Sequence, residues 1–307
     1  MRIFKGQAEL PPQLPPSAVT IGNFDGVHRG HLAIIEPLIQ RAEALGASPT
    51  VVTFDPHPQT VLKGEAPRLL CSPQAKLRRL EAAGIEQVVI LDFDDPLQHT
   101  EPEEFLNGIL LGRLDARAIV VGEGFRFGHM ARGDVVMLRS ESEGSYEFVS
   151  IPLTELKGRR LSSTEIRHAI AAGDLEWAND ALGRPYSLSG EVVKGDGRGK
   201  EIGFPTANIR PLAGMVIPKM GIYAGRLTLS GVSHAAAISV GTKPTFGPHP
   251  VVIEAHLMDF QGEIYGEAVE AEFVAWLRQE RAFDDVSELV SAMEEDVRQA
   301  RKALSSG

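Results

Sequence analysis

The stretch G-N-F-D-G-V-H-R-G-H at residues 22–31 determines the fold of the first half of the chain. It follows an apolar run at 18–21 and precedes apolar residues at 32, 34, 35, 38 and 39, which recur at helical spacing. This order predicts a strand, a glycine-rich turn and a helix. Such an arrangement places backbone N–H groups and a helix N-terminus beside a bound anion. We therefore expect a phosphate-binding turn at this point.

The residues of the turn suit that role. Gly22, Gly26 and Gly30 lack a Cβ atom, so the main chain can approach a phosphate closely. His28 and His31 can donate hydrogen bonds to phosphoryl oxygens where negative charge develops. A plain loop and a metal site are the alternatives, but no carboxylate or third histidine is spaced nearby as in a zinc site. The stretch resembles the G-x-F-D-x-x-H-x-G-H signature of the nucleotidyltransferase superfamily, whose members transfer AMP from ATP to a phosphate or carboxylate.

Composition limits the classes of protein to which the chain can belong. Its 307 residues suffice for two domains, and 43% are apolar, without a run long enough to span a membrane. The balance of 31 basic and 41 acidic residues, a net charge of −10, argues against a general nucleic-acid binder. The single cysteine, Cys71, excludes an internal disulfide and suits a reducing compartment. With no signal-peptide core near Met1, we expect a cytoplasmic protein.

Strand and helix patterns alternate through the first half. After the glycine-rich turn, strands are expected at 49–54, 87–93 and 116–121. Ser72 and Pro73 predict the start of one helix, and Thr100 with Glu103 predicts a capping box for another. Repeated strand–helix units indicate an α/β doubly wound parallel sheet with helices on both faces.

The pattern changes near Pro185. Strand-like segments at 187–194, 221–229, 235–240, 251–260 and 267–273 alternate with Gly- and Pro-containing turns, and a helical stripe follows at 284–304. This predicts a small antiparallel β-barrel with a C-terminal helix. We therefore expect two domains, at residues 1–183 and 184–307.

The hydroxyl-rich segment at 162–167 allows two interpretations. Ser162 and Glu165 form a good capping box by themselves. However, Ser163, Thr164 and Arg167 at a helix start would also make a pyrophosphate clamp, which we favour because the chain needs a second phosphate-binding element.

Two further groups of residues in the second half suggest catalysis. The loop G-D-G-R-G-K at 195–200 is either a long hairpin loop or a cover for phosphates. Thr206 and Asn208 alternate onto one face of an extended segment and offer hard oxygen ligands for Mg²⁺. Glu254 shares a strand face with His256. That face is either solvated or, as we expect, directed into the closed barrel where the substrate lies.

With both halves considered, the chain resembles the bacterial bifunctional riboflavin kinase/FMN adenylyltransferases, often called FAD synthetases. This resemblance covers nearly the whole chain. The matching motifs, besides that at 22–31, are F-D-P-H-P at 54–58, F-R-F-G at 125–128, S-S-T-E-I-R at 162–167, L-G-R-P-Y at 182–186, G-F-P-T-A-N at 203–208, P-K-M-G-I-Y-A at 218–224, P-T-F at 244–246 and E-A-H-L-M-D-F at 254–260.

The resemblance implies an N-terminal nucleotidyltransferase domain and a riboflavin kinase barrel. The kinase makes FMN from riboflavin and ATP with Mg²⁺, and the adenylyltransferase joins FMN to AMP and releases pyrophosphate. By position, the catalytic residues would be Glu254 as the base, with His28, His31 and Arg167 at the phosphates. The implied ATP-binding residues of the adenylyltransferase are Gly22, Phe24, Asp25, Gly26, His28, Gly30, His31, Ser163, Thr164 and Arg167. Its implied flavin-binding residues are Asp55, Pro56, His57, Pro58, Phe125 and Phe127. In the kinase, ATP would contact Gly195, Gly197, Arg198, Gly199, Lys200, Thr206 and Asn208, and the metal would be held by Thr206 and Asn208.

Three residues depart from the family pattern. Gly124 replaces the usual Asp or Asn, Lys200 replaces a frequent Arg, and Ser239 replaces a common Asn.

Three alternative functions remain open. The chain could be a riboflavin kinase with a weakened adenylyltransferase domain or a non-catalytic flavin-binding protein. It could also be an adenylyltransferase of another substrate with a nucleic-acid-binding barrel. We expect small-molecule substrates (ATP, riboflavin and FMN), neither nucleic acid nor membrane as partner, and leave self-association open.

Overall fold

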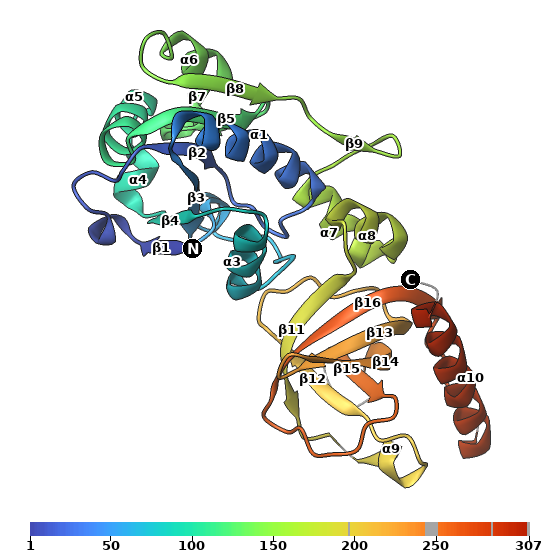
Figure 1. The fold of residues 1–307 in the computed structure, drawn as a ribbon. Coiled ribbons are helices and arrows are strands. Elements are labelled where there is room, and N and C mark those ends of the chain that lie inside the picture. Colours follow the sequence, from blue (N-terminus) through green and yellow to red (C-terminus); the bar gives the residue numbers. More distant parts are fainter. Residues whose placement is uncertain (196, 243–250, 284, 306–307) are drawn as a thin grey trace. The chain divides into compact units, whose positions relative to one another are not determined.

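The structure is a computed structural model that describes residues 1–195, 197–242, 251–283 and 285–305. Asp196 of the predicted phosphate-covering loop and the P-T-F motif at 244–246 lie outside the described residues. The chain divides into two compact units (Figure 1). The first comprises Met1–Pro67 and Pro73–Ser162, and the second comprises Arg68–Ser72 and Ser163–Gly307.

The first unit is built on a six-stranded parallel sheet, as predicted. Its strand order is β1-β4-β3-β2-β5-β8, so the direction of winding reverses beside β2. The two edge strands, β1 and β8, were not predicted because they are short and half exposed. The strands are β1 (Arg2–Lys5), β2 (Ser17–Ile21), β3 (Ser48–Asp55), β4 (Gln87–Asp92), β5 (Ala116–Gly122) and β8 (Glu147–Ile151).

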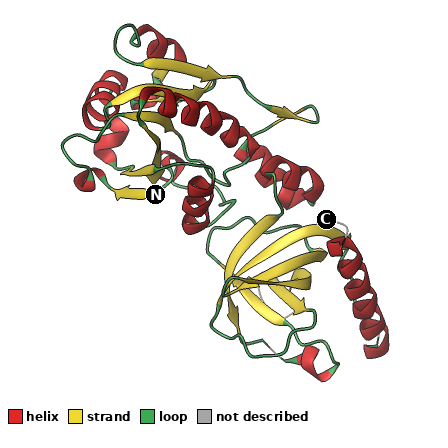
Figure 2. Ribbon diagram, in the orientation of Figure 1, coloured by secondary structure: helices red, strands yellow, loops and turns green. Residues whose placement is uncertain are grey.

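Helices cover both faces of this sheet (Figure 2). On one face, α1 and α3 bury Leu38 and Leu80 against the sheet, and on the other face the π-helix η2 buries Phe105 and Leu110. Helix α1 ends where predicted, because Gly46 adopts a left-handed conformation with φ of 60°. The helices are α1 (Arg29–Leu45), α2 (Pro58–Lys63), α3 (Pro73–Ala82), α4 (Asp95–His99), α5 (Pro102–Glu104), η2 (Phe105–Arg113) and α6 (Val135–Ser140), with short 3₁₀ turns η1 (Gln7–Glu9) and η3 (His129–Ala131). Two small hairpins pair β6 (Arg126–Phe127) with β7 (Gly133–Asp134) and β9 (Glu155–Leu156) with β10 (Arg159–Arg160).

The capping box predicted at Thr100 is wrong. Thr100 instead ends helix α4, and its hydroxyl donates to the Pro96 carbonyl at 3.0 Å. Glu101 occupies the N-cap position of α5, while its carboxylate pairs with Arg132 at 3.0 Å. The helix begins at Pro102, the preferred first helical residue, without a side-chain cap.

The second unit contains a closed antiparallel barrel with strand order β11-β12-β15-β14-β13-β16, also as predicted. Along β15, Ile253, Ala255 and Leu257 are buried in the barrel core, whereas Glu254 and His256 are half-buried on the opposite side. The expectation that Glu254 points into the barrel is therefore wrong, because apolar side chains already fill the interior. The strands are β11 (Tyr186–Val193), β12 (Ala207–Pro211), β13 (Gly221–Leu229), β14 (Val232–Thr242), β15 (Val251–Leu257) and β16 (Ala268–Arg278).

Among the residues that the structure describes, four helices accompany the barrel: α7 (Ser163–Ala172), α8 (Leu175–Leu182), α9 (Arg198–Glu201) and α10 (Val286–Ser305). The C-terminal helix α10 packs on the outer side of strands β13, β14 and β16. Helix α8 is joined to the barrel through Asn179, whose side-chain amide donates to the Phe273 carbonyl at 3.0 Å and accepts from the Tyr186 N–H at 2.7 Å. None of the described helices is long and apolar enough to cross a membrane.

A five-residue segment, Arg68–Ser72, belongs to the second unit although both of its neighbours in sequence belong to the first. The Leu69 N–H donates to the Gly214 carbonyl at 2.7 Å, and the Val216 N–H donates to the Leu69 carbonyl at 3.0 Å. The Ser189 hydroxyl donates to that of Ser72 at 3.1 Å. These bonds add a short parallel bridge to the barrel unit.

The predicted domain boundary between residues 183 and 184 stays a prediction, and Asn179 gives a way to examine it. We expect a fragment of residues 184–307 to have a free energy of unfolding lower, by about 2 kcal/mol or more, than a fragment of residues 173–307. The shorter fragment loses the Asn179 bonds and the burial of Trp177, each of which contributes on the order of 1–3 kcal/mol. Urea unfolding followed by circular dichroism measures the difference. Asn179→Ala in the longer fragment should reproduce part of it, and equal stabilities would show that α8 does not support the barrel.

Candidate functional sites

The glycine-rich turn lies at the point where the winding of the parallel sheet reverses. It joins β2 to α1, and β2 hydrogen-bonds to β3 on one side and to β5 on the other. In open α/β sheets, the crevice at such a reversal, beyond the carboxyl ends of the strands, is where ligands bind. The predicted phosphate-binding turn thus occupies the usual ligand position of this fold.

The two histidines of the turn lie together at the start of α1. Their rings stack with centroids 3.6 Å apart, and the His31 ring also lies 4.9 Å from that of Phe24. The His28 backbone N–H donates to Nδ1 of His31 at 3.4 Å, which leaves Nε2 as the donor atom of a neutral His31 ring. A Cβ atom at Gly30 would lie 3.1 Å from the His28 ring, so the small residue permits this packing.

An aromatic pocket of about 240 Å³ lies within the first unit, near the carboxyl ends of β3, β4 and β5. The rings of Phe125 and Phe127 stack with centroids 5.5 Å apart, and those of Phe54 and Phe93 meet edge to face at 5.7 Å. Flat rings on several sides suit a planar aromatic ligand. The residues that line the pocket are Phe54, Pro58, Leu62, Phe93, Leu97, Gln98, Phe105, Phe125, Arg126, Phe127, Gly128, Met130 and Ala131.

Part of the predicted flavin-binding set lines this pocket. Pro58, Phe125 and Phe127 do so, whereas Asp55, Pro56 and His57 are not among the lining residues. His57 begins helix α2, where its Nδ1 accepts from the Gln59 N–H at 3.1 Å. The other lining phenylalanines, Phe54, Phe93 and Phe105, were missed, although Phe54 and Phe93 stand at the ends of predicted strands.

Ser163, Thr164 and Arg167 lie on the first turns of α7, in the second unit. The Arg167 Nε donates to the Arg68 carbonyl at 2.5 Å. Because the histidines belong to the first unit, the combined phosphate site of His28, His31 and Arg167 stays a prediction.

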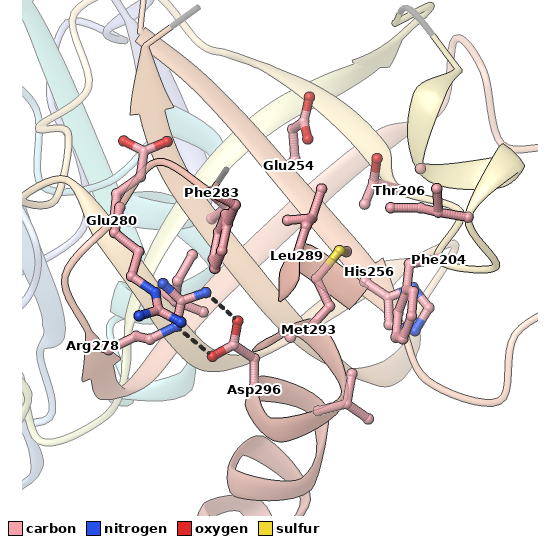
Figure 3. Close-up of a pocket in the computed structure, with 17 residues that line it drawn as sticks. Phe204, Thr206, Glu254, His256, Arg278, Glu280, Phe283, Leu289, Met293 and Asp296 are labelled. Atoms are coloured by element: carbon pink, nitrogen blue, oxygen red, sulfur yellow. Dashed lines mark hydrogen bonds and ion pairs between the residues drawn. The ribbon is translucent and has the colours of Figure 1, made fainter. Parts of the chain in front are cut away.

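A second pocket, of about 300 Å³, lies on the outer side of the barrel (Figure 3). Thr206, Glu254 and Gly199 line one side of it. The register pairs Glu254 with Asn208 of β12 and with Ser239 of β14, so these side chains lie on the same face of the sheet. His256 is one step further along, and its Nδ1 lies 2.9 Å from the Pro205 carbonyl. The structure thus brings the predicted base and Thr206 to one wall.

The glycine-rich loop lies directly against the predicted metal ligands. A Cβ atom at Gly199 would approach the Thr206 hydroxyl to 3.4 Å, and one at Gly195 would overlap the Asn208 amide at 2.2 Å. Asn208 is 9% exposed and does not itself line the pocket. Gly197, Arg198 and Lys200 follow in the same loop, the last two on helix α9. No cluster of three or more His, Cys, Asp or Glu able to hold a metal occurs among the described residues. The oxygen ligands predicted for Mg²⁺ are the Thr206 hydroxyl and the Asn208 amide.

The opposite wall comes from the C-terminal helix and the end of β16, which sequence reasoning did not identify. Arg278 makes a two-pronged ion pair with Asp296 of α10, with both N–O distances 2.7 Å. The guanidinium also lies over the ring of Phe283, 5.7 Å from its centroid. Figure 3 shows Leu289 and Met293 facing the same space. The sequence did hold a signal for Asp296, because it is an acidic residue within the otherwise apolar stripe of the C-terminal helix.

Two protein families match the chain, one in each half. The family model described as FAD synthetase matches residues 10–165, and that described as riboflavin kinase matches residues 182–304. The two matches together span most of the chain.

Curated relatives match nearly end to end. The bifunctional riboflavin kinase/FMN adenylyltransferase of Pseudomonas fluorescens is 36% identical over 98% of this chain and 97% of its own length. That of Listeria monocytogenes is 34% identical over 92% of this chain and 91% of its own. A crystal structure from Streptococcus pneumoniae, titled macrolide-efflux protein, has the same fold, with a TM-score of 0.90, 28% identity, and coverage of 98% of this chain and 99% of that one. The chain therefore belongs to the family of bifunctional riboflavin kinase/FMN adenylyltransferases.

Proposed function

We propose that the two reactions of this family are divided between the two halves of the chain, with FMN adenylyltransferase in residues 1–183 and riboflavin kinase in residues 184–307. The observation that carries the kinase assignment is the barrel pocket, in which Glu254 and Thr206 lie across from the apolar side chains of Leu289 and Met293 on α10. A flat flavin ring suits the apolar side, and the reacting hydroxyl and phosphates suit the polar side. Passive binding of a flavin would require neither a carboxylate nor the glycine-rich loop.

In the kinase step, the Glu254 carboxylate takes the proton from the 5′-hydroxyl of riboflavin. The hydroxyl oxygen then forms a bond to the γ-phosphorus of ATP, and the bond from that phosphorus to the bridging oxygen of ADP breaks. FMN and ADP are the products. The protein contributes a base, alignment and charge stabilisation, and no covalent intermediate is needed.

Mg²⁺ fits the oxygen ligands at this wall. Thr206 and Asn208 would hold it together with nucleotide phosphates, where the ion offsets phosphate charge. The close approach of Gly195 and Gly199 to these two side chains supports this role, because a larger residue at either position would fill the space. Gly197, Arg198 and Lys200 complete the loop that we propose covers the phosphates.

In the adenylyltransferase step, the flavin ring of FMN would occupy the phenylalanine-lined pocket of the first unit. A phosphate oxygen of FMN forms a bond to the α-phosphorus of ATP, and pyrophosphate leaves. His28 and His31 donate hydrogen bonds to the phosphates as charge builds up, and Arg167 with Ser163 and Thr164 grips the pyrophosphate. The glycine-rich turn supplies backbone N–H groups at the start of α1.

The partners of the chain are then small molecules: ATP, riboflavin and FMN. We place the protein in the cytoplasm, and the single cysteine supports this location because it suits a reducing compartment. The net charge of −10 disfavours nucleic acid as a further partner.

Glu254→Gln tests the kinase base. We expect FMN formation to fall by about 10²–10⁴-fold while riboflavin still binds, because the amide keeps the shape but cannot accept the proton. Kinase turnover and flavin-fluorescence titration of the same variant measure the two effects. FAD synthesis from supplied FMN should continue. Glu191→Gln, which changes an exposed carboxylate on β11, is the matched control and should leave both activities intact. Unchanged turnover in Glu254→Gln would leave the kinase without this base.

Replacement of His28 or His31 by Ala tests the first site. FAD formation should fall by about 10²-fold or more, as for the loss of a donor that stabilises transition-state charge. FMN formation should stay within a factor of about two, because the barrel site is separate. Both rates are read from one chromatographic separation of flavins. Equal losses of the two activities would mean that the histidines serve the fold and not the reaction.

Asp296→Asn tests the wall of the kinase pocket that α10 and the end of β16 form. The change leaves Arg278 without its charged partner, so we expect the KM for riboflavin to rise by about 10-fold and the free energy of unfolding to fall by about 1–3 kcal/mol. Steady-state kinetics and thermal unfolding measure these values. Glu295→Gln on the same helix, whose carboxylate pairs with the exposed Arg298, is the control. A riboflavin KM equal to that of the wild type would place the flavin elsewhere.

A further inference from the structure

The glycine-rich turn holds a sterically unfavourable backbone conformation. Phe24 and Val27 have φ angles of 50° and 42°, in the left-handed region that bulky and β-branched residues rarely adopt. Gly26 between them has φ of 84°. Such conformations persist only where surrounding contacts hold them. Both side chains are buried, which restrains the second half of the turn.

The first half of the turn is restrained by a lysine from another helix. Lys76 of α3 donates from Nζ to the Asn23 carbonyl at 3.3 Å and to the Thr53 hydroxyl at 3.2 Å. The Thr53 hydroxyl also donates to the Asn23 carbonyl, at 3.3 Å. Thr53 is wholly buried on β3, which fixes the position of its hydroxyl. Three groups that are far apart in sequence therefore meet at one peptide of the turn.

The peptide that they hold is the one that joins Asn23 to Phe24. Its carbonyl accepts the two hydrogen bonds, and its N–H belongs to Phe24, the first residue with a left-handed conformation. Because a peptide is planar, a fixed carbonyl also fixes the direction of the N–H on the other side. The contacts with Lys76 and Thr53 thus fix the orientation of the peptide at the start of the turn.

We propose that Lys76 is a positioning residue of the adenylyltransferase site. It acts through the Asn23 carbonyl, orienting the turn so that the backbone N–H groups and the two histidines meet the phosphates of ATP. Its positive charge beside the turn adds a favourable potential for the nucleotide. This inference rests on the proposed function of the first site and adds to it a residue, on a different helix, that controls the binding of ATP but not of FMN.

Lys76→Met removes the ammonium group and keeps an unbranched apolar side chain. We expect kcat/KM for ATP in FAD synthesis to fall by about 10- to 100-fold, because a misplacement of catalytic groups by about 1 Å can cost about 10²-fold in rate. The KM for FMN and the riboflavin kinase rate of the same protein should stay within about twofold. Lys76→Arg keeps the charge and the donors, and should recover most of the loss. Lys5→Met, at an exposed lysine of β1, is the control and should behave as the wild type.

Thr53→Val examines the same peptide without a change in α3. It should lower kcat/KM for ATP in the same direction, by about threefold, because Lys76 still holds the carbonyl. In the double variant Lys76→Met/Thr53→Val, the loss should be clearly different from the product of the single losses, since both residues act on one carbonyl. Losses that multiply would mean that Lys76 contacts the nucleotide directly, and would overturn a positioning role.

The proposal also fails if Lys76→Met leaves kcat/KM for ATP unchanged, if the KM for FMN rises equally, or if Lys76→Arg is no better than Lys76→Met. Should Lys76→Met not fold, Thr53→Val and Lys76→Arg still measure the effect on ATP. The histidine variants separate this outcome from failure of the proposed function. If His28→Ala abolishes FAD synthesis while Lys76→Met has no effect, the site stands and the role of Lys76 does not.

Discussion

The packing of the barrel interior constrains the whole second unit. Six antiparallel strands close around a core of buried apolar side chains, among them Ile253 and Ala255. A barrel of this size has no room for a ligand, so a ligand of this unit must bind on its outer surface. A surface site exposes substrate to water unless another element covers it. Helix α10 supplies the cover, and the ion pair between Arg278 and Asp296 attaches it to β16.

In the first unit, the helices that cover the sheet determine where a ligand can bind. Its sheet is covered by helices on both faces, so the accessible edge is the one where the strands end. The glycine-rich turn and the phenylalanine-lined pocket both follow strand ends, which brings the two histidines and the aromatic rings to the same edge of the sheet. The turn then requires support from outside its own sequence, because neither Phe24 nor Val27 favours its backbone conformation.

Local patterns in the sequence predicted much of this arrangement. The glycine-rich turn predicted the strand and the helix on either side of it. The shared strand face of Thr206 and Asn208 stays a prediction, because β12 begins at Ala207 and Thr206 but not Asn208 lines the pocket. The direction of the Glu254 face could not be predicted, because it depends on which side of the closed barrel is already filled. The capping box predicted at Thr100 was wrong because Thr100 ends the preceding helix, α4. Sequence patterns did not identify Arg278, Asp296 or Lys76, because each contacts partners that only the tertiary fold brings close.

The segment Arg68–Ser72 has a consequence for how such proteins can be recombined. The barrel unit takes these five residues from a position flanked on both sides by residues of the other unit. The barrel unit is consequently not encoded by one uninterrupted stretch of the gene. An exchange of genetic material at a single point would transfer the barrel without the backbone bonds from Leu69 to Gly214 and Val216. A complete transfer of the barrel unit requires three junctions, at 67/68, 72/73 and 162/163. Joining this unit to a different domain is therefore harder than in a gene whose two domains meet at a single junction.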